Sequence, residues 1–262
     1  MGFSSILDPI LNPLLAWGPF WAILIISLFV SVFTTIIYKY TTNQEKLKVL
    51  KADMKRLQNK AKAYTKEGKN DKAMKTQKEM MKMNGQYFKS SMKSTLYTFL
   101  PLIIFFGWLG MHLAFAPLTP GIDFSVTTVA LPGATGELTL NLPEELNSSS
   151  NLTQNIKNNS VTWMLHGPAG YYDMSVNHNG SGEEEFFSLI VSNKQEYIEP
   201  LHKIEASSVF ETILVGNKKL KIFEGIFLFG GIPWIKTWGW FGAYFLFSII
   251  FSTTLRKLMK LA

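Results

Sequence analysis

The 262-residue chain contains no cysteine, which excludes disulfide bonds, cysteine-bound zinc and thiol nucleophiles. Lysine and arginine are missing from residues 1–19, and without a basic stretch there we expect no ordinary cleavable signal peptide. The four histidines, at positions 112, 166, 178 and 202, lack the spacing of a metal site. The composition thus gives no support to thiol chemistry or to metal binding.

Catalytic motifs are missing as well. The sequence has no Gly-x-Ser-x-Gly elbow, no His-Glu-x-x-His helix, no phosphate-binding glycine loop and no pair of carboxylates within an apolar segment. Ion pumps and intramembrane proteases need ionisable groups inside the membrane, and here only His112 lies within an apolar segment, near its end. We therefore expect no enzyme, no catalytic residue, no metal and no cofactor.

The residues that are present are strongly segregated along the chain. Hydrophobic residues make up 47% of it, yet the mean hydropathy is only +0.11, because charged blocks separate the apolar ones. Residues 20–38, 94–116 and 232–255 are predicted transmembrane helices. The first has 19 residues, which rise about 28 Å and match the hydrocarbon core of a bilayer. Residues 1–19 and 226–231 are expected to lie at the membrane interface outside the cell.

A basic block at residues 39–93 predicts a cytoplasmic, antiparallel coiled-coil hairpin. It holds 16 Lys or Arg against five acids. Apolar residues in steps of three and four form its first seam: Leu47, Leu50, Met54, Leu57, Ala61 and Tyr64. A turn at Glu67–Asp71 leads to a second helix, Lys72–Ser91, with a methionine-rich face. That face is interpreted either as hairpin core or as an adaptable surface for apolar partners.

Residues 117–225 have a different character, with acids outnumbering lysines. Short alternating segments separated by turns predict an extracellular β-sandwich-like domain. The expected strands are Asp123–Leu131, Gly136–Leu142, Val161–Leu165, Tyr171–Asn177, Glu185–Ser192, Ser207–Val215 and Lys219–Phe223. Four Asn-x-Ser/Thr sequons are candidate glycosylation sites, at Asn147, Asn151, Asn158 and Asn179.

The charge distribution predicts the orientation in the membrane. Lys and Arg concentrate in the hairpin and in the tail at 256–262, which are therefore expected in the cytoplasm. The N-terminus and the acidic domain are expected outside. The fold predicted is an α-helical, multi-pass protein of the cell membrane, with three spans and an N-out, C-in topology.

Hydroxyl groups gather in the cytoplasmic halves of all three predicted spans. The polar positions are Ser27, Ser31, Thr34, Thr35, Ser94, Thr95, Thr98, Ser248, Ser252 and Arg256. In a single helix such hydroxyls commonly bond their own backbone carbonyls or a neighbouring helix. Because three helices share the same polarity, we favour a hydrophilic groove that opens to the cytoplasm and shortens the apolar barrier for a polar segment.

The order of these features resembles a known family. An N-out span, a basic hairpin, a proline-bearing span that begins at Ser94–Pro101, and a last span with Trp238–Phe241 and Ser248–Ser252 are similar to the archaeal YidC-like proteins. These belong to the Oxa superfamily of membrane insertases, with the insertase subunit of the ER membrane complex. The resemblance implies insertion of membrane proteins through a cytosol-facing groove, without a cofactor. Two features depart from the superfamily: the groove face of the first span lacks the arginine of bacterial members, and the acidic β domain is additional.

The expected partners are membrane lipids and nascent membrane proteins, with the ribosome, through its RNA, and a translocon as further candidates. Hairpin residues assigned to contact with client or ribosome are Lys48, Lys51, Lys55, Arg56, Met74, Met80, Met81 and Met83. Anionic lipid is an equally open partner for the lysines. Three other functions remain as alternatives: a membrane-anchored receptor for a cytosolic targeting factor, a channel, and a cell-surface adhesion or scaffold protein.

Overall fold

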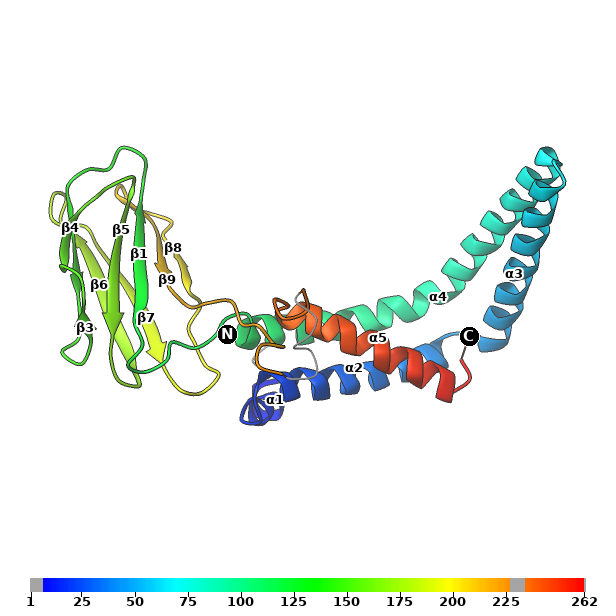
Figure 1. Cartoon of the computed structure of the whole chain (residues 1–262), viewed down its shortest axis with the longest axis horizontal. Coiled ribbons are helices and arrows are strands. Elements are labelled where there is room, and N and C mark those ends of the chain that lie inside the picture. Colours follow the sequence, from blue (N-terminus) through cyan, green and yellow to red (C-terminus); the bar gives the residue numbers. More distant parts are fainter. Residues whose placement is uncertain (1–6, 227–233, 262) are drawn as a thin grey trace. The chain divides into compact units, whose positions relative to one another are not determined.

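The computed structural model describes residues 7–226 and 234–261, which form two compact units (Figure 1). The helical unit contains residues 23–107 and 241–261. The β unit contains residues 7–22, 108–226 and 234–240. Residues 1–6, most of the predicted interfacial segment at 226–231, and the first two residues of the predicted third span lie outside the described residues.

Four helices build the helical unit: α2 (Pro19–Thr41), α3 (Gln44–Lys66), α4 (Asn70–Leu113) and α5 (Trp240–Leu258). The ends of α2 and α4 extend into the β unit. Within residues 7–226 and 234–261, two segments are long and apolar enough to cross a membrane, Pro19–Thr41 and Ser94–Leu113. In α2 the apolar run stops where Lys39 enters the last turn, at the favourable end of the helix dipole.

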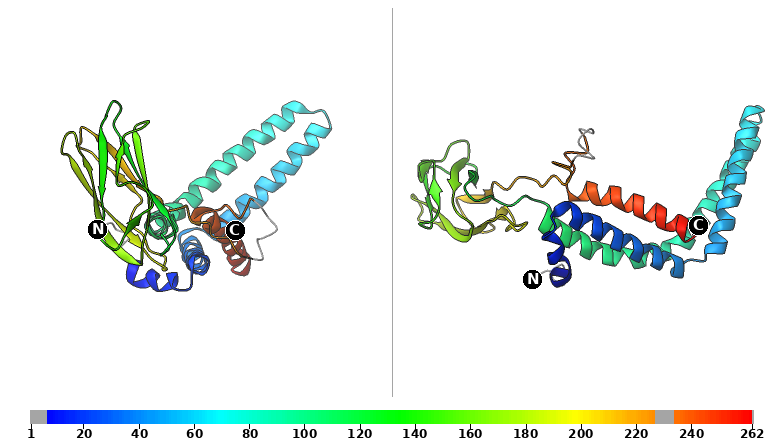
Figure 2. Two further views of the ribbon diagram at one scale, coloured as in Figure 1. Left: turned by 60° about the vertical axis from the view of Figure 1, so that its left-hand side comes forward. Right: turned by 60° about the horizontal axis from the view of Figure 1, so that its bottom comes forward.

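Helices α3 and α4 form an antiparallel hairpin, which is seen from two directions in Figure 2. The Asn43 side chain caps α3 by accepting a hydrogen bond from the Lys46 amide at 2.9 Å. At the other end Gly68 adopts a φ of +71°, which lets the Lys69 amide reach back to the Tyr64 carbonyl at 2.9 Å. The predicted seam is buried at Leu47, Leu50, Leu57 and Ala61.

The predicted boundary at residues 93 and 94 is not a break. Helix α4 runs without interruption for 44 residues, so the second hairpin helix and the second apolar segment are one helix. Residues 86–100 contain neither glycine nor proline, and nothing in their backbone chemistry ends a helix. Pro101 lies inside α4 and does not end it.

Helix α5 begins at Trp240, eight residues later than the predicted third span. Residues 234–237 form a turn instead, and residues 238 and 239 are irregular. The Ile222 amide donates to the Trp238 carbonyl at 3.0 Å, and the Trp238 amide donates to the Ile235 carbonyl at 3.0 Å. A tertiary hydrogen bond therefore takes the place of helical pairing just before α5, which the local sequence did not reveal.

A short helix, α1 (Asp8–Leu15), lies within residues 1–19, the segment expected at the membrane interface, although it contains two prolines. Pro9 lies in the first turn, where a missing amide hydrogen costs no helical bond. The Asp8 carboxylate accepts a hydrogen bond from Trp108 Nε1 of α4 at 2.9 Å, and Trp108 is fully buried. This bond fixes the start of α1 against the end of α4.

The predicted β-rich domain is present as two antiparallel sheets that share one core. One sheet has the order β3 (Asn147–Ser148), β5 (Ser160–His166), β1 (Phe124–Ala130), β9 (Phe210–Val215) and β8 (Leu201–Lys203). The other has the order β4 (Thr153–Asn155), β2 (Glu137–Asn141), β6 (Gly170–His178) and β7 (Glu184–Val191). Alternating residues of both sheets, such as Trp163 and Val176, fill the core. The expected strand at Lys219–Phe223 is wrong, since only Lys219 makes an isolated bridge, to Phe115.

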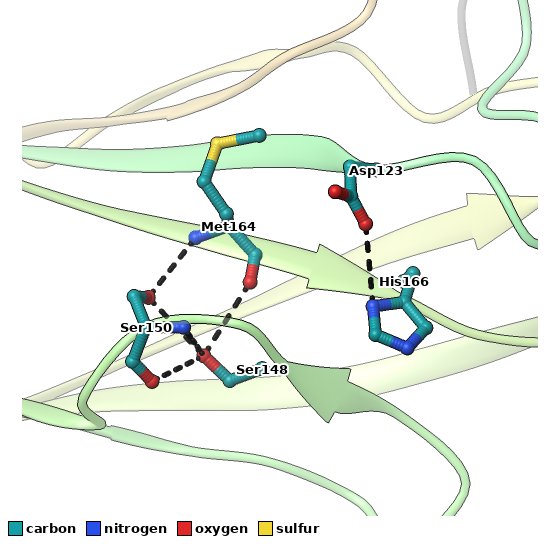
Figure 3. A network of polar contacts seen from close by, with 5 residues as sticks. All are labelled: Asp123, Ser148, Ser150, Met164 and His166. Carbon is teal, nitrogen blue, oxygen red and sulfur yellow. Dashed lines mark hydrogen bonds and ion pairs between the residues drawn. The ribbon is translucent and has the colours of Figure 1, made fainter.

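Hydroxyl groups organise the serine-rich loop between β2 and β5 (Figure 3). The Ser150 hydroxyl accepts a hydrogen bond from the Met164 amide at 3.1 Å, and the Ser148 hydroxyl donates to the Ser150 carbonyl at 2.8 Å. At the end of β5, His166 Nδ1 lies 3.3 Å from Oδ1 of Asp123, the residue before β1. These side chains replace backbone pairing where β3 is only two residues long.

The loop between β7 and β8 caps the end of α4. Gln195 Nε2 donates to the carbonyls of His112 and Phe115, at 3.0 and 2.8 Å. The Tyr197 hydroxyl accepts from the Ala114 amide at 3.0 Å, and its burial raises the pKa of the phenol. The final carbonyls of a helix lack partners within it, so these side chains stabilise the α4 terminus and attach it to the β sandwich.

Glu183 provides a pH-dependent stabilisation of the β unit. Its carboxylate accepts hydrogen bonds from Ser207 Oγ at 2.6 Å, from the Ser208 amide at 3.2 Å, and from the Ser208 hydroxyl. The Ser207 and Ser208 hydrogen bonds lower the pKa of Glu183. A carboxyl whose pKa is lower in the folded state stabilises the fold above its unfolded pKa, about 4.3, and loses this effect as the pH falls through the folded pKa.

We therefore expect Glu183→Gln to lower the melting temperature of the β unit at pH 7, which is measured by the tryptophan fluorescence of the whole protein. The difference from the wild type should vanish as the pH is lowered below the folded pKa of Glu183. Glu144→Gln, at an exposed carboxylate, is the control and should show no such pH dependence. A constant difference at all pH values would contradict the role of the charge.

Candidate functional site

The polar face of α2 is buried inside the helical unit. Ser27, Ser31 and Thr35 recur every four residues, and their exposed fractions are 0, 3 and 2%. Thr35 Oγ1 donates to the Ser31 carbonyl at 2.6 Å, whereas Ser27 Oγ has no hydrogen-bond partner among the described residues. Thr34 is half-buried and bonds the same carbonyl at 3.2 Å. A polar stripe therefore runs along the covered side of an otherwise apolar helix.

The predicted groove residues of α4 and α5 are divided between the interior and the surface. Ser94 is buried, Thr98 is half-buried and Thr95 is exposed. On α5, Ser248 and Ser252 are half-buried. The neighbouring Thr253 and Thr254 are exposed, and each donates to a carbonyl one turn earlier in α5. The structure thus gathers part of the predicted set in the interior and leaves the rest outside it.

Contacts between side chains join each pair of the three apolar helices. Between α2 and α4 the ring centroids of Phe29 and Phe105 are 6.1 Å apart, and between α4 and α5 those of Phe106 and Tyr244 are 4.9 Å apart. Between α5 and α2 the guanidinium carbon of Arg256 lies 4.6 Å from the centroid of the Tyr38 ring. Ser31 precedes Tyr38 by seven residues, and Ser248 precedes Arg256 by eight. At the rise of an α-helix, each serine is therefore about 10–12 Å from the Arg256–Tyr38 contact along its helix. Helices α2 and α5 run in the same direction (Figure 2), so the two serines lie at similar depth.

The last turn of α5 carries the only arginine of that helix, Arg256. The Arg256 guanidinium lies over the Tyr38 ring, an arrangement that favours a cation. Tyr38 is buried with Leu47, and Tyr87 and Leu261 pack against this pair. The base of the hairpin, the end of α2 and the residues after α5 therefore meet in one cluster. Arg256 therefore lies beyond the last residue of the polar stripe, and not halfway along the stripe.

A cavity on the hairpin brings together two sets of residues that the sequence assigned to client or ribosome contact. It has a volume of about 380 Å³, and its walls include Lys51 and Lys55 of α3 and Met80 and Met81 of α4. Both lysines are exposed, and Met81 is 71% exposed. The methionine face is thus neither all core nor all surface. The remaining predicted contacts, Lys48, Arg56, Met74 and Met83, do not line this cavity.

The four sequon asparagines are all exposed, on the β unit. Asn158 lies in the tight turn before β5 with a φ of +51°, and Asn179 Oδ1 accepts a hydrogen bond from Thr139 at 3.1 Å. Among the described residues there is no group of three or more His, Asp or Glu side chains placed to hold a metal ion.

Comparison with known families identifies the family of this chain. Residues 4–165 match the family model described as integral membrane protein EMC3/TMCO1-like, which is more than half of the chain. The chain belongs to the EMC3/TMCO1-like family. This family is part of the Oxa1/YidC/EMC3 insertase superfamily and is associated with the insertion of membrane proteins. The comparisons with curated proteins and with solved structures find no match.

The part that matches the EMC3/TMCO1-like model contains α1, α2, the hairpin, the whole of α4 and the β sandwich as far as β5. The polar stripe of α2 and the hairpin cavity both lie within it. Sequence reasoning missed Asp8, Gln195 and Tyr197, which hold the end of α4. Their roles depend on partners about 80 to 100 positions away along the chain, which no local pattern reveals.

Proposed function

We propose that this chain inserts membrane proteins, with the polar stripe of α2 serving as one wall of a cytosol-facing groove. The observation that carries the proposal is the burial of Ser27, Ser31 and Thr35 along one side of a membrane-length helix. Burying a hydroxyl without a partner costs about 1–3 kcal/mol, and Ser27 has none within the described residues. A client segment with polar groups would supply that partner once the helices separate.

In the structure the stripe is covered, so insertion requires α2 to move away from α4 or α5. The contacts that would break include the aromatic pair Phe29–Phe105 and the stacking of Arg256 on Tyr38. Opening would admit water and a short hydrophilic tail to about half the depth of the bilayer. The apolar part of the client would then pass sideways into lipid, and the mechanism involves no covalent chemistry and no cofactor.

The orientation and the third span are part of the same proposal. Helix α5 has an apolar run that ends at Arg256 and Lys257, and tryptophans precede it. Lysines and arginines of the hairpin and the tail support a cytoplasmic location for both. The N-terminus and the β unit would then lie outside the cell. Within the superfamily, the order of spans and the basic hairpin favour the archaeal YidC-like proteins.

The hairpin cavity supports a client-binding or ribosome-binding role. Lysines bind RNA phosphates or acidic segments, and the adaptable methionines Met80 and Met81 accept apolar side chains of varied shape. This observation also favours a second candidate function, a membrane-anchored receptor that binds a cytosolic targeting factor through the hairpin alone. The two functions differ in whether the client ever reaches α2.

Site-specific photo-crosslinking to a nascent membrane protein on a stalled ribosome separates these functions. If the chain is an insertase, a photoreactive residue should crosslink to the client both in place of Ser31 and in place of Met81. A residue in place of Ile36, which is exposed on α2, serves as the control and should give weaker client crosslinking. Crosslinks from Met81 without any from Ser31 would support the receptor and contradict the insertase.

A further inference from the structure

A large cavity lies in the β unit, and no residue of the polar stripe or of the hairpin cavity lines it. Its volume is about 890 Å³, within the range of small-molecule and cofactor sites. Three segments form its walls: the end of α1 with the start of α2, the end of α4 with the residues after it, and the loop between β7 and β8. Neither the predicted groove nor the predicted hairpin contacts include any of these residues.

The walls are held in place by side chains already described. The Asp8–Trp108 hydrogen bond fixes α1 to α4, and Gln195 and Tyr197 fix the loop to the end of the same helix. Ser192 Oγ donates to Glu196 at 2.5 Å, which orders the loop internally. The cavity is therefore formed without a ligand, and binding there would not require the walls to be reordered.

The chemistry of the cavity is divided between an apolar and a polar side. Leu15, Ala16, Pro19 and Met111 provide apolar surface. Asn12, His112, Lys194 and Glu196 provide polar groups. The Glu196 carboxylate accepts the hydrogen bond from Ser192, and the Lys194 ammonium forms no ion pair among the residues that the structure describes. Both ring nitrogens of His112 face acceptors of the protein, the Trp108 carbonyl at 3.0 Å and Asp8 at 3.4 Å. Lys194 is thus the cation available to a ligand.

We propose that this cavity binds the head group of a phosphate-bearing membrane lipid. Trp17 and Trp21, beside the cavity in sequence, are 66 and 54% exposed at the start of the apolar helix α2. Exposed tryptophans at the end of a membrane helix mark the level of lipid head groups. At that level Lys194 pairs with the phosphate while the first part of the lipid chain follows Ala16, Pro19 and Met111. The proposal goes beyond insertion and does not depend on it.

The test uses the full-length protein in phosphatidylcholine vesicles that contain phosphatidylglycerol with a photoreactive group near the glycerol. Mass spectrometry should find the label in the wild-type peptide around Met111, at several times its density on the exposed side of α2. Ala16→Trp fills the cavity and should reduce this label at least fivefold. Lys194→Glu, at the surface, should reduce it about threefold and keeps the test valid if the larger substitution disturbs folding.

The control is Lys203→Glu on β8, which makes the same charge change at an exposed position outside the cavity and should leave the label unchanged. Equal labelling of the wild type and both cavity variants would overturn the proposal. A label at Met111 no denser than on the lipid-facing side of α2 would do the same. Soluble glycerol phosphate should not compete; complete competition would show a site for a soluble anion and contradict the lipid assignment.

Discussion

Replacing Ser27 and Ser31 with alanine and Thr35 with valine should reduce client insertion about 10- to 100-fold while leaving the protein folded. Hydroxyl hydrogen bonds between membrane helices are worth about 0.6 kcal/mol each on average, so losing three of them to a client, about 1.8 kcal/mol, corresponds to a loss of rate of about 20-fold, within that range. The measurement is protease protection of a short-tailed, single-span client added to reconstituted vesicles. Valine has the shape of threonine, and alanine only removes the hydroxyl, so the packing of α2 is little changed.

The stability of the same variant makes the prediction specific. Ser27 Oγ has no partner within the described residues, so its removal should not lower the melting temperature. The matched control is Thr253→Val with Thr254→Val on α5, where both hydroxyls are exposed and bond their own helix. That control should insert clients at the wild-type rate. A folded stripe variant with full insertion activity would refute the groove and favour the receptor.

The sequence revealed features that depend on local composition. The apolar run from Phe20 to Tyr38 predicted α2 to within three residues at either end, because Lys39 and the polar residues that follow end the hydrophobic stretch. Alternation of apolar residues located most strands of the β unit. The hydroxyls of α2 share one face because Ser27, Ser31 and Thr35 are four residues apart, and this could be counted from the sequence.

Features that depend on distant partners could not be predicted. The start of α5 is set by the hydrogen bond between Ile222 and Trp238, and α1 is fixed by a tryptophan 100 positions away. Ser94 is buried and the adjacent Thr95 is exposed, although the sequence analysis assigned both hydroxyls to the groove. Which of two adjacent hydroxyls is covered depends on the side of the helix that faces its neighbours, and composition does not contain this information.

Reversing two charges of the hairpin cavity should weaken the binding of ribosome–nascent chain complexes at least tenfold. In Lys51→Glu with Lys55→Glu, two carboxylates replace two exposed ammonium groups beside Met80 and Met81. If the lysines contact ribosomal RNA, the wild-type affinity falls steeply with salt, by about 0.7–0.9 logarithmic units per tenfold increase for each phosphate contact. The affinity of the variant should then depend less steeply on salt, with a slope smaller by the amount expected for about two phosphate contacts. The affinity is measured by sedimentation with vesicles.

The control that gives this result its meaning is Lys62→Glu with Lys66→Glu. These residues are exposed on the same helix with the same spacing of four, and they do not line the cavity. Equal loss in both variants would show a diffuse attraction of the basic hairpin to any polyanion, including anionic lipid, and would contradict a defined site.

Met80→Ser with Met81→Ser distinguishes the two partners, the nascent chain and the ribosomal RNA. Loss of client crosslinking with unchanged ribosome binding would assign the methionines to the nascent chain and the lysines to the RNA, because removing apolar surface leaves phosphate contacts intact.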